Sequence, residues 1–398
     1  MAIAVFLLAV FFLSVVVSIA LSIMQIRYVK RLQGQKAEIL SDAVWQSAAE
    51  YSKVQEKVSI FSTIYNAVIF LWWIAFGLRF LDFIYIESSA LKAVCLMALF
   101  VCFNEILTLP INYYKSFIVD AKYGFNNTTK SIFTADWVKS LVITLLLVSA
   151  IAYILSEILL DYAISRWIAV FFILMIMLIA INMLFPVIRA KFFDKFTPID
   201  QTELGASIIA LLEKAGFKSK GVFCVDASKR DTRLNAYFAG IGATKSVVLY
   251  DTLVEKLSKD EILAVLGHEL GHFRHKDIYK NIAVIGVLLF AFLAIFANLP
   301  SGYFEFFGLQ KSSHVIMLSF VLFSSPLFFF AAPLFNFISR RNEFAADQFG
   351  AELTSKEALK LALIKLINEN KSFPKKQPLY ALFYETHPNI IERLDRLQ

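Results

Sequence analysis

Seven long apolar runs constrain the fold of this chain more than any other feature of its sequence. Each run has about 20 predominantly hydrophobic residues, the length that an α-helix needs to cross the hydrocarbon core of a bilayer. The runs cover residues 2–24, 59–80, 90–111, 137–160, 167–188, 281–299 and 315–338. They predict a mainly α, polytopic membrane protein with seven transmembrane helices.

Composition supports a bilayer environment and argues against other classes of protein. Of the 398 residues, 58% are hydrophobic and 18% are charged, which is too apolar for an average soluble protein. Lysine and arginine on the cytosolic flanks of membrane helices explain the net charge of +7, so we expect no nucleic-acid partner.

Three scattered cysteines argue against a disulfide framework or a cysteine-based zinc site. The first run is too long for the apolar part of a signal peptide, which predicts a retained anchor.

Basic residues between the runs predict the orientation of the chain. The connection after the first run is rich in lysine and arginine, whereas the next one, 81–89, contains neither. Cytosolic loops are enriched in both residues, so the N-terminus is predicted to lie outside and the C-terminus in the cytosol. The predicted regions are 1–188 with five helices and their cytosolic connections, 189–280 as a cytosolic segment, 281–338 with two helices, and 339–398 as a cytosolic tail.

The cytosolic segment contains an HExxH pattern made by His268, Glu269 and His272. Residues four apart lie on one face of a helix, so both imidazoles can reach one Zn²⁺ while Glu269 reaches a water beside it. Gly271, which has no side chain, is expected to leave room for substrate next to the metal. The alternative is a chance match on an ordinary amphipathic helix, and a third ligand must decide between the two.

The residues before this pattern predict a small α/β unit. Short strands are expected at 222–226, 235–240 and 245–250, with a glycine turn at 240–242. An S-x-x-E capping box at 258–261 is expected to begin the metal-binding helix. A strand beside that helix could bind an extended peptide, and 235–240 is the candidate, although an ordinary hairpin strand fits equally well.

A third metal ligand is predicted after the last run, where two crossings have returned the chain to the cytosolic side. Glu343 lies there, with Asp347 four residues later on the same helical face. Together with the two histidines, Glu343 would form a His₂Glu zinc site, and Asp347 could accept the N–H of a ligating histidine. A solvated acidic face at a helix start is the alternative for this pair. His387 remains possible as the ligand.

The tail and the remaining histidines offer further candidates. His387 and Arg393 could stabilise the negative charge of a tetrahedral intermediate or hold a peptide carbonyl, although an arginine in a terminal helix is more often a surface residue. His275 lies two turns after His268, too far to share its metal, and is expected at the surface or beside a ligand. His314, on the outer side, is expected to be an interfacial histidine.

Several longer motifs give the chain a resemblance to a known family. They are LPINYYKSFIVDAKYGFNNTT, FFDKFTPI, NAYFAG, VVLYDTL, VLGHELGH, RRNEFAAD and HPNIIERL. In this order they resemble the type I CAAX prenyl endopeptidases, seven-span zinc proteases that process prenylated C-terminal tails. The short connection between VVLYDTL and the metal helix resembles a compact bacterial form.

The resemblance implies a fold, a cofactor and a set of site residues. The fold is seven transmembrane helices around a hydrated chamber, with a small α/β domain of the HExxH, gluzincin-like type at its cytosolic end. Asn104 and Glu105 could face that chamber or bond between helices. The implied roles are one Zn²⁺ per chain on His268, His272 and Glu343, Glu269 as general base, Asp347 as partner of a ligand, His387 and Arg393 at the substrate and intermediate, and Asn235, Ala236 and Tyr237 in the substrate-binding edge strand.

The expected function is therefore zinc-dependent cleavage near the C-terminus of a peptide or protein that can carry a prenyl group. The membrane would be the bacterial inner membrane, or the endoplasmic reticulum in a eukaryote. The alternative enzyme is a membrane quality-control protease resembling HtpX, whose membrane portion is shorter. A seven-span receptor or transporter would explain the hydropathy but not the metal and tail motifs. The sequence does not indicate an oligomeric state.

Overall fold

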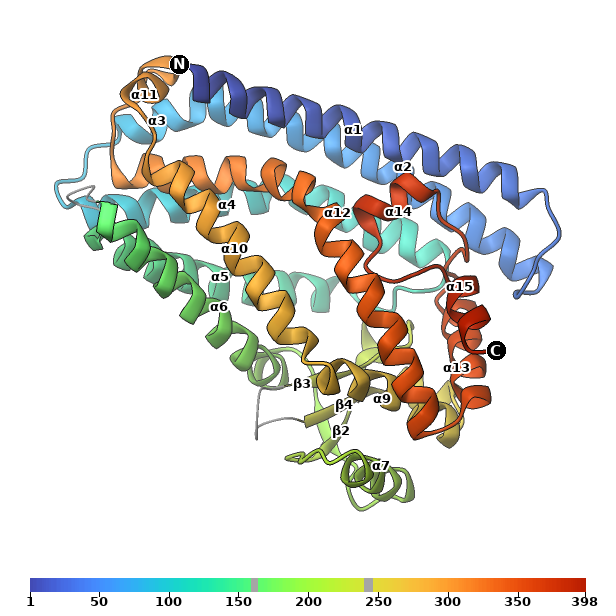
Figure 1. Ribbon diagram of the computed structural model, residues 1–398. Coiled ribbons are helices and arrows are strands. Elements are labelled where there is room, and N and C mark those ends of the chain that lie inside the picture. The colour runs from blue at the N-terminus through green and yellow to red at the C-terminus, as the bar shows by residue number, and fades with distance from the viewer. Residues whose placement is uncertain (159–163, 240–245) are drawn as a thin grey trace.

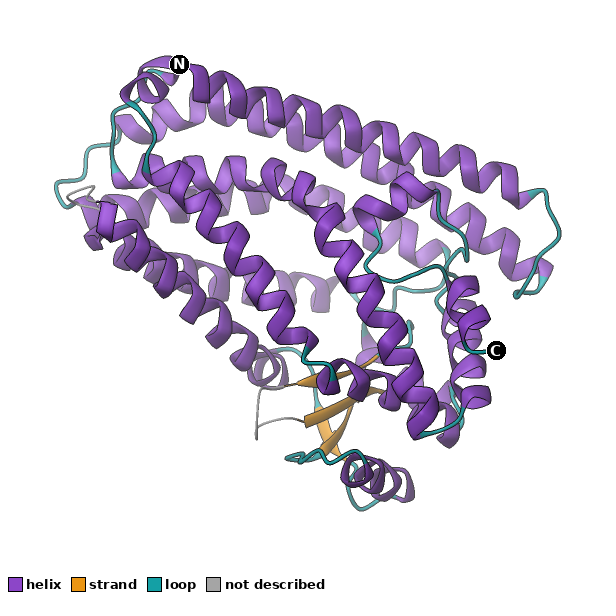
Figure 2. Ribbon diagram, in the orientation of Figure 1, coloured by secondary structure: helices purple, strands orange, loops and turns teal. Residues whose placement is uncertain are grey.

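Long helices make up most of the molecule, and a small sheet lies at one end of them (Figure 1, Figure 2). The structure, a computed structural model, describes residues 1–158, 164–239 and 246–398. Within these ranges, seven helices are long and apolar enough to cross a membrane. They coincide with the seven apolar runs, so the predicted mainly α architecture is confirmed.

The first five crossing helices extend beyond the runs that predicted them. Helix α1 has 32 residues, or about 48 Å at 1.5 Å per residue, whereas the hydrocarbon core is about 30 Å thick. Hydropathy detects only the part of each helix that is apolar, so the polar ends were not predicted. Residue 160, the expected end of the fourth run, lies outside the described residues. The helices are α1 (Ala2–Gln33), α2 (Asp42–Trp72) continued by η1 (Trp73–Gly77) and α3 (Leu78–Phe83), α4 (Ser89–Tyr114) continued by η2 (Lys115–Asp120), α5 (Lys130–Ile158) and α6 (Ile164–Phe192).

The last crossing helix, α12 (Ser313–Leu353), connects the membrane part to the candidate site. It contains Pro326 and Pro333, and it changes direction along its length (Figure 1), as proline in a helix commonly causes. It continues well beyond residue 338, the predicted end of the run, and carries Glu343 and Asp347 on the extension. The preceding helices are α10 (Asp277–Ala297) and the short α11 (Ser301–Phe307).

A four-stranded sheet lies next to the HExxH helix, in the strand order β1-β2-β4-β3. Three of its strands match the predicted ones, with β2 and β4 parallel and the other pairs antiparallel. The fourth, β1, was not predicted because it has only three residues and includes a proline. The predicted turn at 240–242 lies outside the described residues. The elements of this segment are β1 (Phe196–Pro198), α7 (Glu203–Lys214), β2 (Val222–Val225), η4 (Ala227–Lys229), β3 (Ala236–Ala239), β4 (Ser246–Tyr250) and α8 (Asp251–Lys256).

The HExxH helix, α9 (Lys259–Arg274), begins with the predicted capping box. The Ser258 hydroxyl accepts a bond from the Glu261 backbone, and the Glu261 carboxylate accepts one from the Ser258 N–H. Ile262, Leu266 and Leu270 are buried in the core shared with the sheet, as the four-residue spacing of an amphipathic helix requires. This apolar face fixes the rotation of α9 and so the direction of its histidines.

Glycines allow α9 and α12 to approach closely. A side-chain carbon added at Gly271 would lie 2.7 Å from the Cα of Ala346, and one at Gly350 would lie 2.6 Å from the backbone N of His268. Gly271 therefore faces α12, and the expectation that it leaves room for substrate beside the metal is wrong. Its missing side chain brings the two helix backbones together instead.

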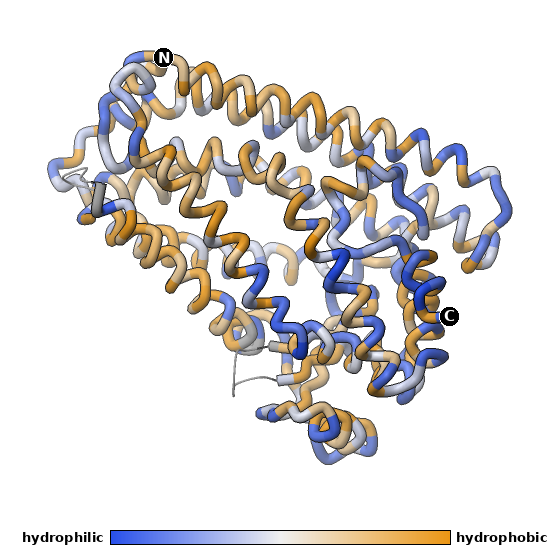
Figure 3. Tube along the Cα trace, viewed as in Figure 1, coloured by the Kyte–Doolittle hydropathy of each residue, from blue (hydrophilic) through white to orange (hydrophobic). Residues whose placement is uncertain are grey.

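The two ends of the molecule differ in character. The N-terminus, α3 and α11 lie at one end, whereas the sheet, α9 and the C-terminus lie toward the other (Figure 1). Hydrophobic residues dominate the crossing helices, and hydrophilic residues gather where α10 begins and along the later part of α12 (Figure 3). The tail forms three more helices at this second end: α13 (Lys356–Glu369), α14 (Pro378–Tyr384) and α15 (Ile390–Arg396).

Candidate active site

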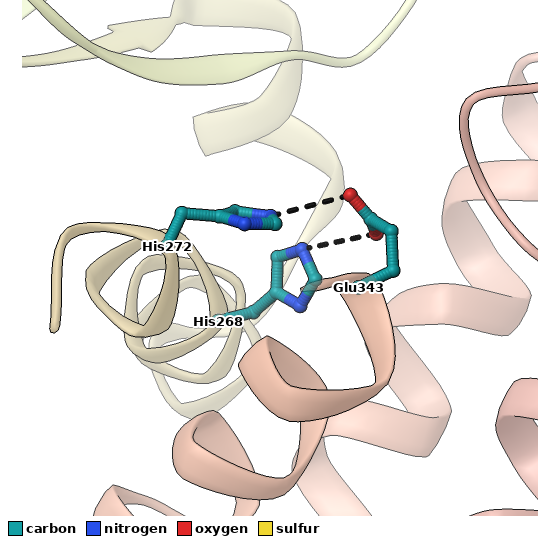
Figure 4. A group of neighbouring side chains, drawn as sticks. All are labelled: His268, His272 and Glu343. Atoms are coloured by element: carbon teal, nitrogen blue, oxygen red, sulfur yellow. Dashed lines mark ion pairs between the residues drawn. The ribbon is translucent and has the colours of Figure 1, made fainter. Parts of the chain in front are cut away.

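The side chains of His268, His272 and Glu343 converge between α9 and α12 (Figure 4). One nitrogen or oxygen atom from each residue lies within 4.8 Å of the others. Nε2 of His272 is 3.2 Å from Oε1 of Glu343, and Nε2 of His268 is 3.5 Å from Oε2. Both imidazoles therefore present the same ring nitrogen to one carboxylate, because residues four apart share a helix face.

A carboxylate holds the other ring nitrogen of each histidine. Nδ1 of His268 lies 2.8 Å from Oδ1 of Asp347, and Nδ1 of His272 lies 3.0 Å from Oδ2 of Asp277. An Nδ1–H that donates to a carboxylate leaves Nε2 with its lone pair, which is the tautomer that a metal ligand needs. The sequence predicted the first of these contacts but not the second.

Asp277 reaches His272 because the chain reverses between α9 and α10. Lys276 adopts a left-handed conformation with φ of 58°, which lets the first residue of α10 return toward the helix just completed. Asp277 also accepts a hydrogen bond from Lys280 Nζ at 2.7 Å. The sequence does show an acidic residue at the start of the next helix. Whether its side chain points toward His272 depends on this turn.

Arg393, on α15, is buried behind the histidines. Its Nε and Nη2 donate to the two carboxylate oxygens of Asp347 at 2.7 and 2.6 Å. Its Nη1 lies 3.6 Å from Oε2 of Glu343. The guanidinium thus lies against the carboxylate that contacts His268, and the substrate contact predicted for Arg393 stays a prediction.

His387 occupies the open side of the group. Its side chain is 60% exposed, and its Nε2 lies 3.3 Å from Oε1 of Glu343. Thr386 Oγ1 lies 3.0 Å from its Nδ1. A cavity of about 940 Å³ lies among the helices and loops of the tail, and its lining includes His387 and Arg393. A molecule in this cavity could reach His387 directly.

Glu269 and β3 complete the surroundings. Glu269 is half-buried on α9, next in sequence to His268. Strand β3 is an edge of the sheet, and the ring of Phe238 on this strand lies 5.1 Å from that of Phe273 on α9. Asn235 and Tyr237 therefore belong to an edge segment beside the HExxH helix.

The electrostatics of His272 reflect its two carboxylate neighbours. Burial alone would lower the pKa of the imidazole, but the hydrogen bonds and charges of Glu343 and Asp277 outweigh it and raise the pKa to about 9. Without a metal ion, His272 is therefore protonated at neutral pH. A metal binds the neutral imidazole, so binding must displace that proton.

The remaining histidines lie apart from this group. His275 is the C-cap of α9, one residue beyond the helix. His314 is buried, and its Nε2 lies 3.0 Å from Oδ1 of Asp82. The expectation that His314 is an interfacial residue is wrong, because α3 and α12 pack around it and supply an acidic partner.

A second cavity lies among the crossing helices. Its volume is about 390 Å³, and its lining includes Ser14, Asn66 and Asn104. Asn104 also accepts a hydrogen bond from Trp73 Nε1 at 3.3 Å. The interhelical bond considered for Asn104 is therefore present, and its place in a hydrated chamber stays a prediction. Glu105 is half-buried.

The central group fits a divalent metal ion by the chemistry of its donors. Two imidazole nitrogens and one carboxylate are the ligands that catalytic zinc sites use, with a position left for water. Oε2 of Glu343 is buried and accepts no hydrogen bond among the described residues. A buried anionic oxygen without a donor is costly, and a cation at this point would neutralise it.

Seven crossing helices and a metal-ligand group on an HExxH helix define the class of an integral-membrane metallopeptidase. The model of peptidase family M48 matches residues 198–398, and the model described as CAAX prenyl protease N-terminal, five membrane helices, matches residues 25–195. The chain belongs to the CAAX prenyl protease 1 family of M48 metallopeptidases. It is a multi-pass membrane metalloendopeptidase that acts on peptides or proteins.

Individual relatives agree over most of the chain. The CAAX prenyl protease 1 of Saccharomyces cerevisiae is 30% identical, over 90% of this chain and 86% of its own. The homologue from Dictyostelium discoideum is 33% identical, over 87% and 82%. The crystal structure of S. mikatae Ste24p superposes with a TM-score of 0.91 at 28% identity and covers 99% of both chains.

Proposed function

We propose that this protein is a zinc endopeptidase that hydrolyses peptide bonds near the C-terminus of prenylated CAAX-type substrates. The observation that carries the proposal is the convergence of three donors, with Nδ1 of each histidine held by a carboxylate. His268, His272 and Glu343 would hold one Zn²⁺ per chain. His387 is the alternative third ligand because it contacts the same carboxylate.

Each residue of the site has a proposed task in peptide hydrolysis. When bound, Zn²⁺ would polarise the scissile carbonyl and lower the pKa of a water molecule to about 7. Glu269, which lies about 100° around the helix from His268, would accept a proton from that water and pass it to the leaving amine. No covalent acyl-enzyme is required.

Two residues of the tail, His387 and Arg393, would contribute to the reaction from different sides of the metal ligands. His387 is exposed toward the large cavity, so it would donate a hydrogen bond to the oxyanion of the tetrahedral intermediate. Arg393 is engaged by Asp347, so we assign it the task of fixing that carboxylate and, through it, the ring of His268. The positive charge of Arg393 would help to stabilise the negatively charged intermediate.

Substrate would bind as an added strand on β3. An edge strand presents unpaired backbone N–H and C=O groups, and an extended peptide can pair with them. Ala236 would make these bonds, because the carbonyl oxygen of Asn235 already accepts the backbone N–H of Tyr250 on β4 and alternate residues of a strand face the same side. Asn235 and Tyr237 would lie beside the bound peptide. Ala236 and Phe238 pack in the core that the sheet shares with α9, the helix on which His268 and His272 lie.

Cleavage of matched peptides tests the substrate class. A CAAX peptide with and without a farnesyl group would be incubated with the purified protein in detergent, and cleavage would be followed by mass spectrometry. We expect kcat/KM to be higher for the farnesylated peptide. Equal cleavage of both peptides, together with cleavage of an unfolded protein, would instead favour an HtpX-like quality-control protease.

The site is proposed to face the cytosol, together with the C-terminus, because of the basic connections on that side. A cysteine at Gln398 should react with a membrane-impermeant thiol reagent only after the cytosolic side is opened. A cysteine at Gln310 should react in intact cells. The native cysteines would be replaced first, and labelling of Gln398 from outside would invert the orientation.

A further inference from the structure

One face of α12 carries a continuous row of polar side chains. Asn336, Arg340, Glu343 and Asp347 follow one another at intervals of three or four residues, so they lie on the same side of the helix. Glu343 is a member of the candidate metal-binding group, and Asp347 contacts Nδ1 of His268. The first two residues of the row contact α14, the short helix that precedes His387.

Arg340 binds the end of α14. Its Nη1 donates to the carbonyl oxygen of Ala381 at 2.9 Å and to that of Glu385 at 2.8 Å. One turn earlier, Asn336 Nδ2 donates to the carbonyl oxygen of Leu382 at 3.2 Å. The Ala381 carbonyl also accepts the backbone N–H of Glu385. A cationic donor at the C-terminal end of a helix is favourable because the helix dipole is negative there.

The loop that carries His387 is consequently attached to α12 on both sides. Before the loop, Arg340 holds the carbonyl of Glu385, two residues ahead of His387. After the loop, Arg393 pairs with Asp347 at 2.6 and 2.7 Å. The two attachment points on α12 are seven residues apart, and Glu343 lies between them.

His387 itself has little packing to hold it, because its side chain is 60% exposed. Its imidazole makes polar contacts with Glu343 and the neighbouring Thr386, so the backbone of its loop contributes much to its placement. We infer that Arg340 is a positioning residue that sets the distance between His387 and the scissile carbonyl by fixing the preceding end of the loop. This inference rests on the role proposed for His387 in stabilising the oxyanion.

The first test compares Arg340→Ala with Arg341→Ala, a matched control. Arg341 is the next residue and has the same charge, but it is exposed. Misplacement of a catalytic group by about 1 Å can cost roughly 100-fold, so we expect Arg340→Ala to lower kcat by roughly 10- to 100-fold with KM and zinc content nearly unchanged. Arg341→Ala should match the wild type. Arg340→Lys, which can still donate to one carbonyl, should recover part of the lost kcat.

A double-mutant cycle separates positioning from simple stabilisation of α14. If Arg340 acts through His387, Arg340→Ala should lower kcat far less in a His387→Ala background than in the wild type. Zinc content and thermal unfolding of each variant would be measured on the same preparations, so that loss of folded protein is not counted as loss of kcat.

Three results would overturn the inference. If His387→Ala lowers kcat and Arg340→Ala retains its full effect in that background, positioning through His387 is wrong while the proposed function stands. If Arg340→Ala reduces only thermal stability and leaves kcat unchanged, Arg340 is merely structural. If His387→Ala has no effect on kcat, the proposed role of His387 fails first and the inference fails with it.

Discussion

At each end of α12 a carboxylate lies against histidine, and the two ends differ in the partners that the protein supplies to the histidine nitrogens. At the far end, Nε2 of His314 lies 3.0 Å from Asp82 and 3.1 Å from the Ser312 hydroxyl. This ring nitrogen of His314 therefore has its hydrogen-bond partners within the protein. At the catalytic end, two Nε2 atoms face Glu343, and one of its oxygens remains without a hydrogen bond.

This comparison shows that a histidine beside a carboxylate does not by itself make a metal site. His314 and Asp82 form a structural pair, with the Ser312 hydroxyl as a further partner of the same ring nitrogen. The catalytic end aims Nε2 of two imidazoles at the carboxylate of Glu343 and holds Nδ1 of each ring with a further carboxylate. Such a set of donors suits a bound cation, so metal removal and mutation should affect the two ends differently.

The largest effect should come from removing the carboxylate at the centre of the catalytic end. Glu343→Ala should deplete zinc and abolish cleavage, because two histidines alone hold the ion weakly. Metal content would be measured by atomic absorption on protein that unfolds at a normal temperature. Full zinc occupancy in this variant would identify His387 as the third ligand.

Glu269→Gln should separate chemistry from metal binding. We expect zinc to be retained and kcat to fall by roughly 10²- to 10⁴-fold, the usual contribution of a general base. The matched change at the far end, Asp82→Asn, should alter neither quantity. Loss of zinc from folded Glu269→Gln protein would contradict the proposed task of this residue.

A smaller effect is expected from Asp277→Asn, because Asp277 holds a ligand without touching the metal. Zinc affinity or activity should fall by roughly 10- to 100-fold, and Asp347→Asn should behave similarly. Competition with a chelator of known affinity would measure the change. Unaltered affinity in Asp277→Asn would mean that the contact with His272 is incidental.

The smallest effect on function should follow from His314→Ala at the far end. The variant leaves Asp82 without its buried partner, so the apparent Tm should decrease by a few degrees while zinc content and kcat remain at wild-type values. Differential scanning fluorimetry in detergent would measure the shift. A loss of zinc in folded His314→Ala protein would show that the two ends of α12 are coupled.

The sequence predicted those features of this protein that depend on neighbours along the chain. The seven apolar runs, the capping box of Ser258 and Glu261, and three of the four strands are local patterns, and the structure contains all of them. The spacing of His268 and His272 likewise fixed their shared helix face before any fold was known. Each of these depends on residues only a few positions apart.

Only the tertiary structure decided how distant elements meet. Because α9 and α12 approach closely, Gly271 lies at a contact between the two helices and does not leave space for substrate. The reversal at Lys276 places Asp277 against Nδ1 of His272. Packing of α3 against α12 buried His314. These outcomes depend on helix rotation and chain reversal, which hydropathy and spacing do not encode. The sequence therefore determined which residues could form a metal site, and the packing of α12 determined how they converge.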